Sequence, residues 1–302
     1  MVPAMTKAVR GVLFLLLLVP GALAADSRPL YAICGAYPPE MEALMKEFQV
    51  DAAGGWTKTT VTGVDFWRGT RAGKDLIVFR TGVSLVNAAY QLQLALDRFP
   101  ITHVFFAGVA GGVDPALHIG DVVIPERWAY HSEAAYLNED GKGGYLQPER
   151  RSPPRYENFG MMFPNDVKVR REGDDGFHEM PAFPADDGLL AVARRVAPGL
   201  PPMRKGGRDV SILVGGTGVA GPVFLDNAKY REWIFRVWQA RCLDMESTAL
   251  AHVAYVNRKP FLIVRGLSDF AGGQPGQNHI NQNEARVAEI AARVLRAIVD
   301  AQ

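Results

Sequence analysis

Two carboxylates stand two positions apart in the stretch CLDMESTALAHVA, which runs from Cys242 to Ala254. In an extended strand, Asp244 and Glu246 point to the same face, because side chains alternate with a period of two. The small and apolar residues after Glu246 predict a buried helix, so both acids lie where a strand ends and a helix begins. Paired carboxylates suit proton transfer and the stabilisation of positive charge in a reacting group. A solvated sheet edge is the structural alternative for the same pair.

Polar or glycine-rich residues also follow predicted strands elsewhere in the chain. Glu40 comes after the strand LYAICGA, the glycine-rich run 108–112 comes after HVFFA, and FLIVRGLSD ends on Ser268 and Asp269. In open α/β sheets, ligands bind beyond the carboxyl ends of the strands. Taken singly, Glu40 also fits a first-turn helix carboxylate and Asp269 an ordinary turn residue. Their shared position at strand ends predicts that they meet in one site.

The elements that must position these residues alternate along the chain. Buried or alternating apolar runs predict strands at 30–36, 64–82 (a hairpin), 103–112, 120–131, 210–216, 242–245 and 260–269. Apolar residues at helical spacing predict helices at 40–48, 84–99, 186–197, 227–239, 246–257 and 283–299. This alternation predicts a single α/β domain with a mixed, mostly parallel central sheet flanked by helices. The run 137–185 has six prolines, six glycines and no sustained period, so we expect an irregular insertion there, with 108–112 forming a glycine loop.

The composition is that of an ordinary globular protein, with 302 residues, 48% hydrophobic, 22% charged and a net charge of +1. That charge gives no electrostatic footprint for a nucleic-acid partner. A basic start, the apolar run GVLFLLLLV and the small residues ALA predict a cleaved signal peptide at 1–24. The domain 25–302 is then secreted or periplasmic, with no membrane span after cleavage. We expect Cys34 and Cys242 to be buried free thiols, and a disulfide is the alternative.

The motifs, taken in order, resemble those of the nucleoside phosphorylase/nucleosidase superfamily, and most of all its methylthioadenosine/S-adenosylhomocysteine nucleosidase branch. The stretches that carry the resemblance are ICGAYPPEME, FRTGVSLVNAAYQLQLAL, HVFFAGVAGGVDPALHIGDVVIPERWAYH and LDMESTALAHVAYVNRKPFLIVRGLSD. The resemblance implies the fold of that superfamily and hydrolysis of the N-glycosidic bond of purine nucleosides, which releases a free base and a ribose derivative. It further implies a nucleoside as the small-molecule partner, no cofactor or metal, and a homodimer.

The resemblance also implies a role for each matching residue. Glu40 falls at the position of the glutamate that activates the attacking water, and Asp269 at that of the acid that protonates or hydrogen-bonds N7 of the purine. Met245 and Glu246 fall on the Met-Glu pair that receives the ribose. The polar shell around the water, the sugar and the acid consists of Asp244, Arg265 and Ser268.

Two valines depart from the pattern of the family. Val109 stands at a position where the family has a hydroxyl residue that helps to hold water or phosphate. Gly111, in the same run, is expected to contact the substrate. Val219, in LVGGTGVAGP, stands where the nucleosidases carry a base-stacking phenylalanine. These departures leave open a phosphate-dependent purine nucleoside phosphorylase, which Val109 disfavours, and a non-catalytic nucleoside-binding protein. The insertion 137–185 is longer than the resemblance implies; a roof over the 5′ side of the sugar is one interpretation of it, and the sequence does not decide its role.

Overall fold

The structure is a computed structural model that describes residues 28–148 and 154–302. The predicted signal peptide at 1–24 lies outside the described residues. None of the described helices is both long enough and apolar enough to cross a membrane.

Four buried strands form the centre of the sheet: β1 (Leu30–Gly35), β4 (Lys74–Arg80), β5 (Ile101–Gly112) and β18 (Phe261–Asp269). They pair in parallel, β4 with β1, β1 with β5, and β5 with β18. Parallel strands covered on both faces are continuous apolar runs, and these four stretches have that composition. Their carboxyl ends therefore meet at one edge, as the sequence predicted.

The sheet extends on both sides of these strands and is mixed. On one side lie β3 (Val64–Arg71) and β2 (Thr57–Val61), which are antiparallel to β4 and to each other. On the other side β5 pairs antiparallel with β17 (Ala240–Asp244), followed in parallel by β16 (Thr217–Ala220) and β7 (Arg127–Tyr130). The short strands β6 (Val122–Ile124) and β15 (Ile212–Val214) pair in parallel, and β6 joins β18. The prediction of one mixed, mostly parallel sheet is confirmed.

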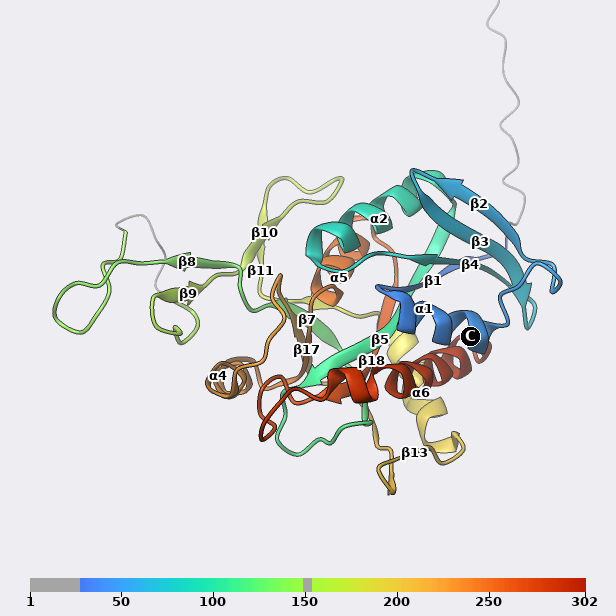
Figure 1. Ribbon diagram of the computed structural model, residues 1–302. Helices are drawn as coiled ribbons and strands as arrows, with labels where there is room; N and C mark the ends of the chain where they lie inside the picture. Colours follow the sequence, from blue (N-terminus) through green and yellow to red (C-terminus); the bar gives the residue numbers. More distant parts are fainter. Residues whose placement is uncertain (1–27, 149–153) are drawn as a thin grey trace, which may run out of the picture.

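Helices cover both faces of the sheet (Figure 1). One pair is α1 (Pro38–Phe48) and α6 (Ile280–Asp300), which pack against each other. The pair on the other side of the central strands is α2 (Leu85–Arg98) and α5 (Ser247–Val256). Two further helices, α3 (Asp187–Val196) and α4 (Ala228–Trp238), begin at the side-chain caps Asp186 and Asn227. Cys34 and Cys242 are buried free thiols, as predicted.

The segment 137–185 is more regular than its composition indicated. Its described part contains strand β9 (Met162–Pro164), which pairs with β8 (Ala134–Tyr136), and the hairpin β10 (Val167–Val169) and β11 (His178–Met180). Strand β12 (Phe183–Pro184) joins the edge of the central sheet beside β7. Figure 1 shows β8 and β9 in an arm that projects away from the body of the molecule. Short strands carry too few residues to show a period, so sequence patterning missed them.

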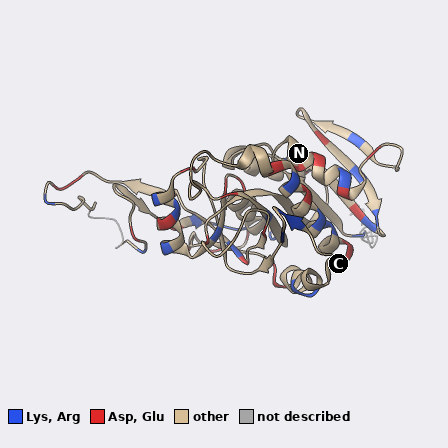
Figure 2. Ribbon diagram, turned by 60° about the horizontal axis from the view of Figure 1, so that its bottom comes forward, with Lys and Arg blue, Asp and Glu red and all other residues tan. Residues whose placement is uncertain are grey.

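Other short elements complete the chain: the 3₁₀ turn Ala197–Gly199 and the hairpin β13 (Arg204–Lys205) with β14 (Arg208–Asp209). The predicted strand 120–131 is divided into β6 and β7, and β2 and β16 were not predicted. Acidic and basic residues are intermixed over the elements in view (Figure 2).

The glycine run at 108–112 is not a loop, because β5 continues as a strand to Gly112. The glycines serve close packing instead. A Cβ atom on Gly108 would lie 1.9 Å from Oε1 of Glu40 and 2.2 Å from Nη1 of Arg265. Glycine inside a strand often marks such a close approach. The run is therefore where side chains from a helix and a neighbouring strand cross over β5.

Candidate active site

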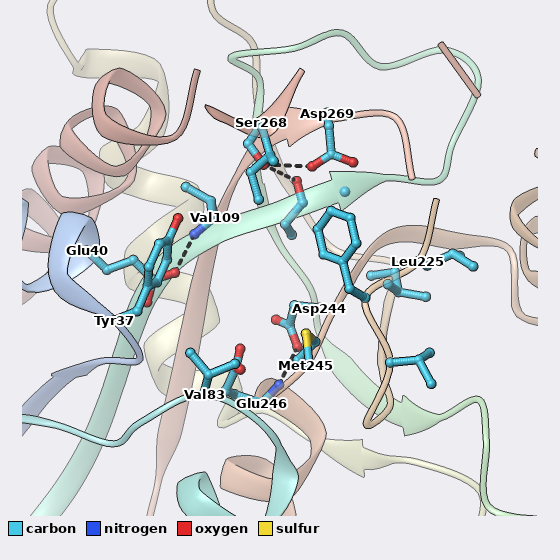
Figure 3. A pocket seen from close by; sticks show the side chains of 16 residues that line it. Tyr37, Glu40, Val83, Val109, Leu225, Asp244, Met245, Glu246, Ser268 and Asp269 are labelled. Carbon is cyan, nitrogen blue, oxygen red and sulfur yellow. Dashed lines mark hydrogen bonds between the residues drawn. The ribbon is translucent and has the colours of Figure 1, made fainter. Parts of the chain in front are cut away.

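A cavity opens at the edge where the carboxyl ends of β1, β5, β17 and β18 meet (Figure 3). The predicted site residues that line it are Glu40, Val109, Gly111, Asp244, Met245, Glu246, Ser268 and Asp269. Arg265 lies immediately behind them, fully buried. Val219 does not line the cavity. The structure thus brings nine of the ten predicted residues together in or directly behind one cavity, at the edge where the rule for α/β sheets places ligands.

Glu40 enters the cavity from the first turn of α1 and is held there by backbone groups. The N–H of Ala36 donates to its Oε2 at 2.6 Å, and the N–H of Val109 donates to its Oε1 at 2.8 Å. Burial raises the pKa of this carboxyl, against the opposing effects of Arg265 and the two N–H donors. A carboxylate poised by burial in this way is suited to accept a proton from water.

Arg265, on β18, binds three carboxylates from three elements. Its Nε donates to Asp244 at 2.6 Å, its Nη1 to Glu40 at 3.2 Å and its Nη2 to Glu246 at 3.4 Å. The guanidinium carbon lies 4.0 Å from the centre of the Phe106 ring, a cation–π contact. We call these four charged residues the Arg265 cluster. With three acids around one cation, it has an excess of negative charge when its acids are ionised.

The pKa of Glu246 is raised well above its usual range. Burial and then Asp244 raise its pKa from 4.5 to about 8, although Arg265 opposes the change. Its Oε1 accepts a hydrogen bond from the N–H of Ser84 at 2.8 Å. Ser84 has a φ of 83°, a rare conformation for a residue other than glycine. Backbone strain of this kind is typical of functional sites, where the surrounding structure holds a backbone group in position. No sequence pattern indicated this role for Ser84.

The side chain of Asp244 accepts hydrogen bonds from groups at the start of α5. Its Oδ1 accepts the N–H groups of Glu246 at 3.0 Å and Ser247 at 2.9 Å. Its Oδ2 accepts the Ser247 hydroxyl and the Arg265 Nε. Asp244 also lines the cavity, but both of its oxygens already accept bonds from protein donors, which fits a supporting part. The solvated-edge alternative for this pair is wrong, since both acids are buried.

Asp269 ends β18 on the far side of the cavity from Glu246 (Figure 3). Its Oδ2 accepts the Ser268 hydroxyl at 2.9 Å, and its Oδ1 accepts the Ala271 N–H at 2.8 Å. The Asn278 amide also donates to Oδ1, at 3.3 Å. These donors hold the carboxyl group in a fixed orientation, so it presents an oxygen to whatever occupies the cavity.

The placement of Val219 against the base is wrong. Val219 lies inside β16, fully buried in a small cluster with Ala129, Trp233 and Leu243. The strand ends at Ala220, and the cavity wall is built by the loop beyond it. The residues of that loop in the wall are Val223, Phe224 and Leu225.

An aromatic side chain is therefore present in the wall, five positions after Val219. Phe224 is 56% exposed and lines the cavity, so its ring is accessible to a ligand there. The sequence did contain a signal for Phe224. It lies in an apolar run, inside a loop that contains Gly and Pro and follows the end of a strand. Sequence reasoning also missed Tyr37, Val83 and Ile280, which complete the apolar part of the wall.

The insertion 137–185 does not contribute to the cavity wall in its described part. The interpretation that it roofs the sugar is therefore not supported by the residues of this chain that the structure describes. Nor do the described ranges contain a group of three or more His, Cys, Asp or Glu side chains arranged to hold a metal ion.

Residues 30–300 match the sequence model of the phosphorylase superfamily. The chain belongs to this superfamily. A 5′-methylthioadenosine/S-adenosylhomocysteine nucleosidase of Marinomonas sp. is 30% identical over 249 residues, covering 82% of this chain and 88% of the relative. The enzyme of the same name from Mycobacterium tuberculosis is 29% identical over 269 residues, covering 87% and 93%.

Solved structures of the superfamily share the fold of this chain. The 5′-methylthioadenosine/S-adenosylhomocysteine nucleosidase of Neisseria meningitidis, in complex with methylthio-immucillin-A, aligns with a TM-score of 0.67 and 21% identity. It covers 90% of this chain and 99% of its own. Futalosine hydrolase of Helicobacter pylori aligns with a TM-score of 0.66 and 19% identity, covering 90% and 97%. At these identities the likeness concerns the fold alone.

Proposed function

We propose that the protein hydrolyses the N-glycosidic bond of purine nucleosides of the methylthioadenosine/S-adenosylhomocysteine type, releasing the free base and a ribose derivative. The observation that carries the proposal is the position of Glu40. It is buried in the cavity wall, held by two backbone N–H donors and Arg265, and faces the same space as Glu246 and Asp269. The named activity of the curated relatives supports the same reaction.

In the proposed mechanism each acid has one task. Glu246 accepts hydrogen bonds from the ribose hydroxyls, which its carboxyl oxygens can do in either protonation state. Asp269 donates a proton to N7 of the purine, which lets the base leave as a neutral molecule when the bond from C1′ to N9 breaks. Glu40 takes a proton from the water whose oxygen bonds to C1′. The negative charge of the Arg265 cluster stabilises the oxocarbenium-like sugar between these two events.

A phosphate-dependent reaction fits the cavity less well. None of the side chains that line it is Lys, Arg or His. Arg265, the cation behind the wall, already binds three carboxylates. A phosphate dianion beside three buried acids lacks a counter-charge, whereas neutral water needs none.

The test is release of free base by residues 25–302 from a panel of nucleosides, followed by chromatography with and without phosphate. The panel contains methylthioadenosine, S-adenosylhomocysteine, adenosine and inosine. We expect release without phosphate, and a loss of at least about 100-fold in kcat for Glu40→Gln. The matched control is Glu42→Gln, an exposed carboxylate on the same helix, which keeps full activity.

Other outcomes of this assay would indicate a different function for the protein. Release that needs phosphate identifies a phosphorylase. Tight binding with no release at high enzyme concentration identifies a nucleoside-binding protein. Unchanged turnover of Glu40→Gln would reject the mechanism even if hydrolysis occurs.

We also propose that the protein acts as a homodimer through the start of α2. Val86 is 78% exposed and Tyr90 is 51% exposed, and they lie on one helix face at a spacing of four. Val83, which lines the cavity, is 42% exposed just before them. A second subunit covering this face would shield an apolar patch and the edge of the cavity together. Analytical ultracentrifugation of the protein and of Val86→Glu tests this, with dimer expected for the first and monomer for the second.

Export of the protein remains a prediction from residues 1–24, and we propose a secreted or periplasmic location. The basic start, the apolar run and the ALA sequence support it. Mass spectrometry of the mature protein tests it. A mature chain that begins at Ala25 is expected, and an intact N-terminus on a protein retained inside the cell would reject it.

A further inference from the structure

A phenol–carboxylate pair borders the cavity and has no part in the mechanism above. Tyr37 lines the cavity, and its hydroxyl donates to Oε2 of Glu284 at 2.8 Å. Glu284 lies on α6, four residues after Ile280, which also lines the cavity. Residues at this spacing share one helix face. Glu284 does not itself line the cavity, but its bond to the Tyr37 hydroxyl and the helix face it shares with Ile280 place its carboxylate directly behind these two lining residues.

The pair lies at the sugar end of the cavity and away from the base end. Tyr37 comes three residues before Glu40, at the start of the same helix. In Figure 3, Tyr37 lies beside Glu40, with Asp269 and Leu225 on other sides of the cavity. A nucleoside with its base at Asp269 and its ribose hydroxyls at Glu246 directs its 5′ carbon away from the base. The 5′ substituent therefore extends toward Tyr37, Val83 and Ile280.

The charges at this end are negative. Burial and then the nearby Glu40 carboxylate raise the pKa of Tyr37, so the phenol remains a neutral donor to Glu284. Within the described part of the chain, no Lys, Arg or His side chain forms an ion pair with Glu284. Glu289, five residues further along α6, differs in this respect because it pairs with Lys46 and Arg286. Glu284 thus has acceptor capacity left for a ligand.

We propose that Tyr37 and Glu284 select nucleosides whose 5′ substituent is a thioether ending in an ammonium group, over those with a short uncharged thioether. The inference rests on the proposed nucleosidase function. The apolar side chains of Val83 and Ile280 contact the sulfur and methylene part of such a substituent. Glu284, oriented by the Tyr37 hydroxyl, accepts from the ammonium group at the cavity mouth, where a charge-assisted hydrogen bond replaces water.

Two adenosine derivatives that differ only at the end of the 5′ chain test the proposal. One carries a 3-aminopropylthio group and the other a butylthio group, so an ammonium replaces a methyl group of similar size. The measured quantity is the ratio of their kcat/KM values for base release. We expect Glu284→Gln to lower this ratio by roughly five- to tenfold. This factor is in the lower part of the range for a charge-assisted hydrogen bond, because the site is partly exposed to solvent.

Two controls separate a local contact from a general charge effect. Glu289→Gln removes a carboxylate from the same helix and keeps the wild-type ratio. Raising the salt concentration lowers the ratio of the wild type and not that of Glu284→Gln, because salt screens a partly exposed charge pair. Tyr37→Phe, which removes the hydroxyl that orients Glu284, lowers the ratio by a smaller factor than Glu284→Gln.

A ratio that does not change in Glu284→Gln overturns the inference and leaves the nucleosidase function intact. If neither nucleoside is cleaved, calorimetric Kd values for the same two compounds carry the test, and the panel of natural nucleosides separately decides whether the proposed function holds. A wild-type preference for the aminopropyl compound that Glu284→Gln abolishes then supports the site. Equal affinities, or no binding of either compound, overturn it.

Discussion

Replacing Glu246 by glutamine is expected to stabilise the folded protein at high pH while abolishing most of its activity. The pKa of Glu246 is raised from 4.5 to about 8, chiefly by burial and by Asp244. Between these two values the folded state keeps a proton that the unfolded state releases. The stability that this protonated group contributes is fully present below pH 4.5 and is lost as pH rises through about 8. Glutamine does not titrate, so the variant lacks this loss.

The size of the effect follows from the same two values. One proton bound only by the folded state changes the free energy of unfolding by about 1.4 kcal/mol per pH unit. Because Glu246 titrates together with its neighbours in the Arg265 cluster, we take the full difference between pH 4.5 and pH 8 as on the order of 3–5 kcal/mol. The variant also keeps the N–H of Ser84 satisfied, because the amide oxygen of glutamine accepts the same bond.

The assay is urea denaturation of the wild type and Glu246→Gln at pH 5, 7 and 9. Groups outside the Arg265 cluster contribute about equally to both proteins, so the difference between the two free energies of unfolding reports on Glu246 and the acids that titrate with it. We expect that difference to shift in favour of the variant as pH rises, while base release falls at least about 100-fold. If the free energies of unfolding of the two proteins change with pH in the same way, a buried, protonated Glu246 is not the source of the pH-dependent loss of stability.

Further predictions concern the groups around the reacting atoms. Gly108→Ala places a Cβ where the Glu40 carboxylate lies, so we expect kcat/KM to fall by roughly 100-fold with the protein still folded by circular dichroism. Phe224→Ala removes the aromatic ring of the wall and is expected to raise KM by roughly two- to tenfold with little change in kcat. Asn278→Ala removes an amide donor to Asp269 and should lower kcat by roughly tenfold, measured against KM in the same assay; an unchanged kcat would show that the other donors suffice.

The regular elements and the strand-end acids could be predicted because their signals are local. The buried runs of β1, β5 and β18 and the apolar stripe of α6 are long enough to show their period. Once a mostly parallel sheet is expected, Glu40 and Asp269 must lie at the same edge, since parallel strands end together. That argument needs no knowledge of how the strands are ordered.

The rest of the site depends on contacts that no local pattern records. Ser84 acts through a backbone N–H in a rare conformation, and its side chain gives no sign of this. Phe224 was missed because its position is set by where β16 ends, and Val219 was chosen in its place. The glycine run was taken for a loop, since a glycine needed for close packing in a strand looks the same in sequence as one needed for a turn.

The Arg265 cluster links the stability of this fold to its proposed chemistry. Burial, and then the neighbouring acids Asp244 and Glu40, raise the pKa of Glu246 against the effect of Arg265, and this costs stability as pH rises. A balanced pair of one arginine and one acid would fold more easily, but it would present no net charge to a cationic sugar. Ligands that carry a positive charge where the oxocarbenium develops should therefore bind more tightly than uncharged nucleosides, and above about pH 8, where Glu246 is ionised, the difference should shrink in Glu246→Gln. The cost in stability and the gain in transition-state binding have the same origin, the third carboxylate.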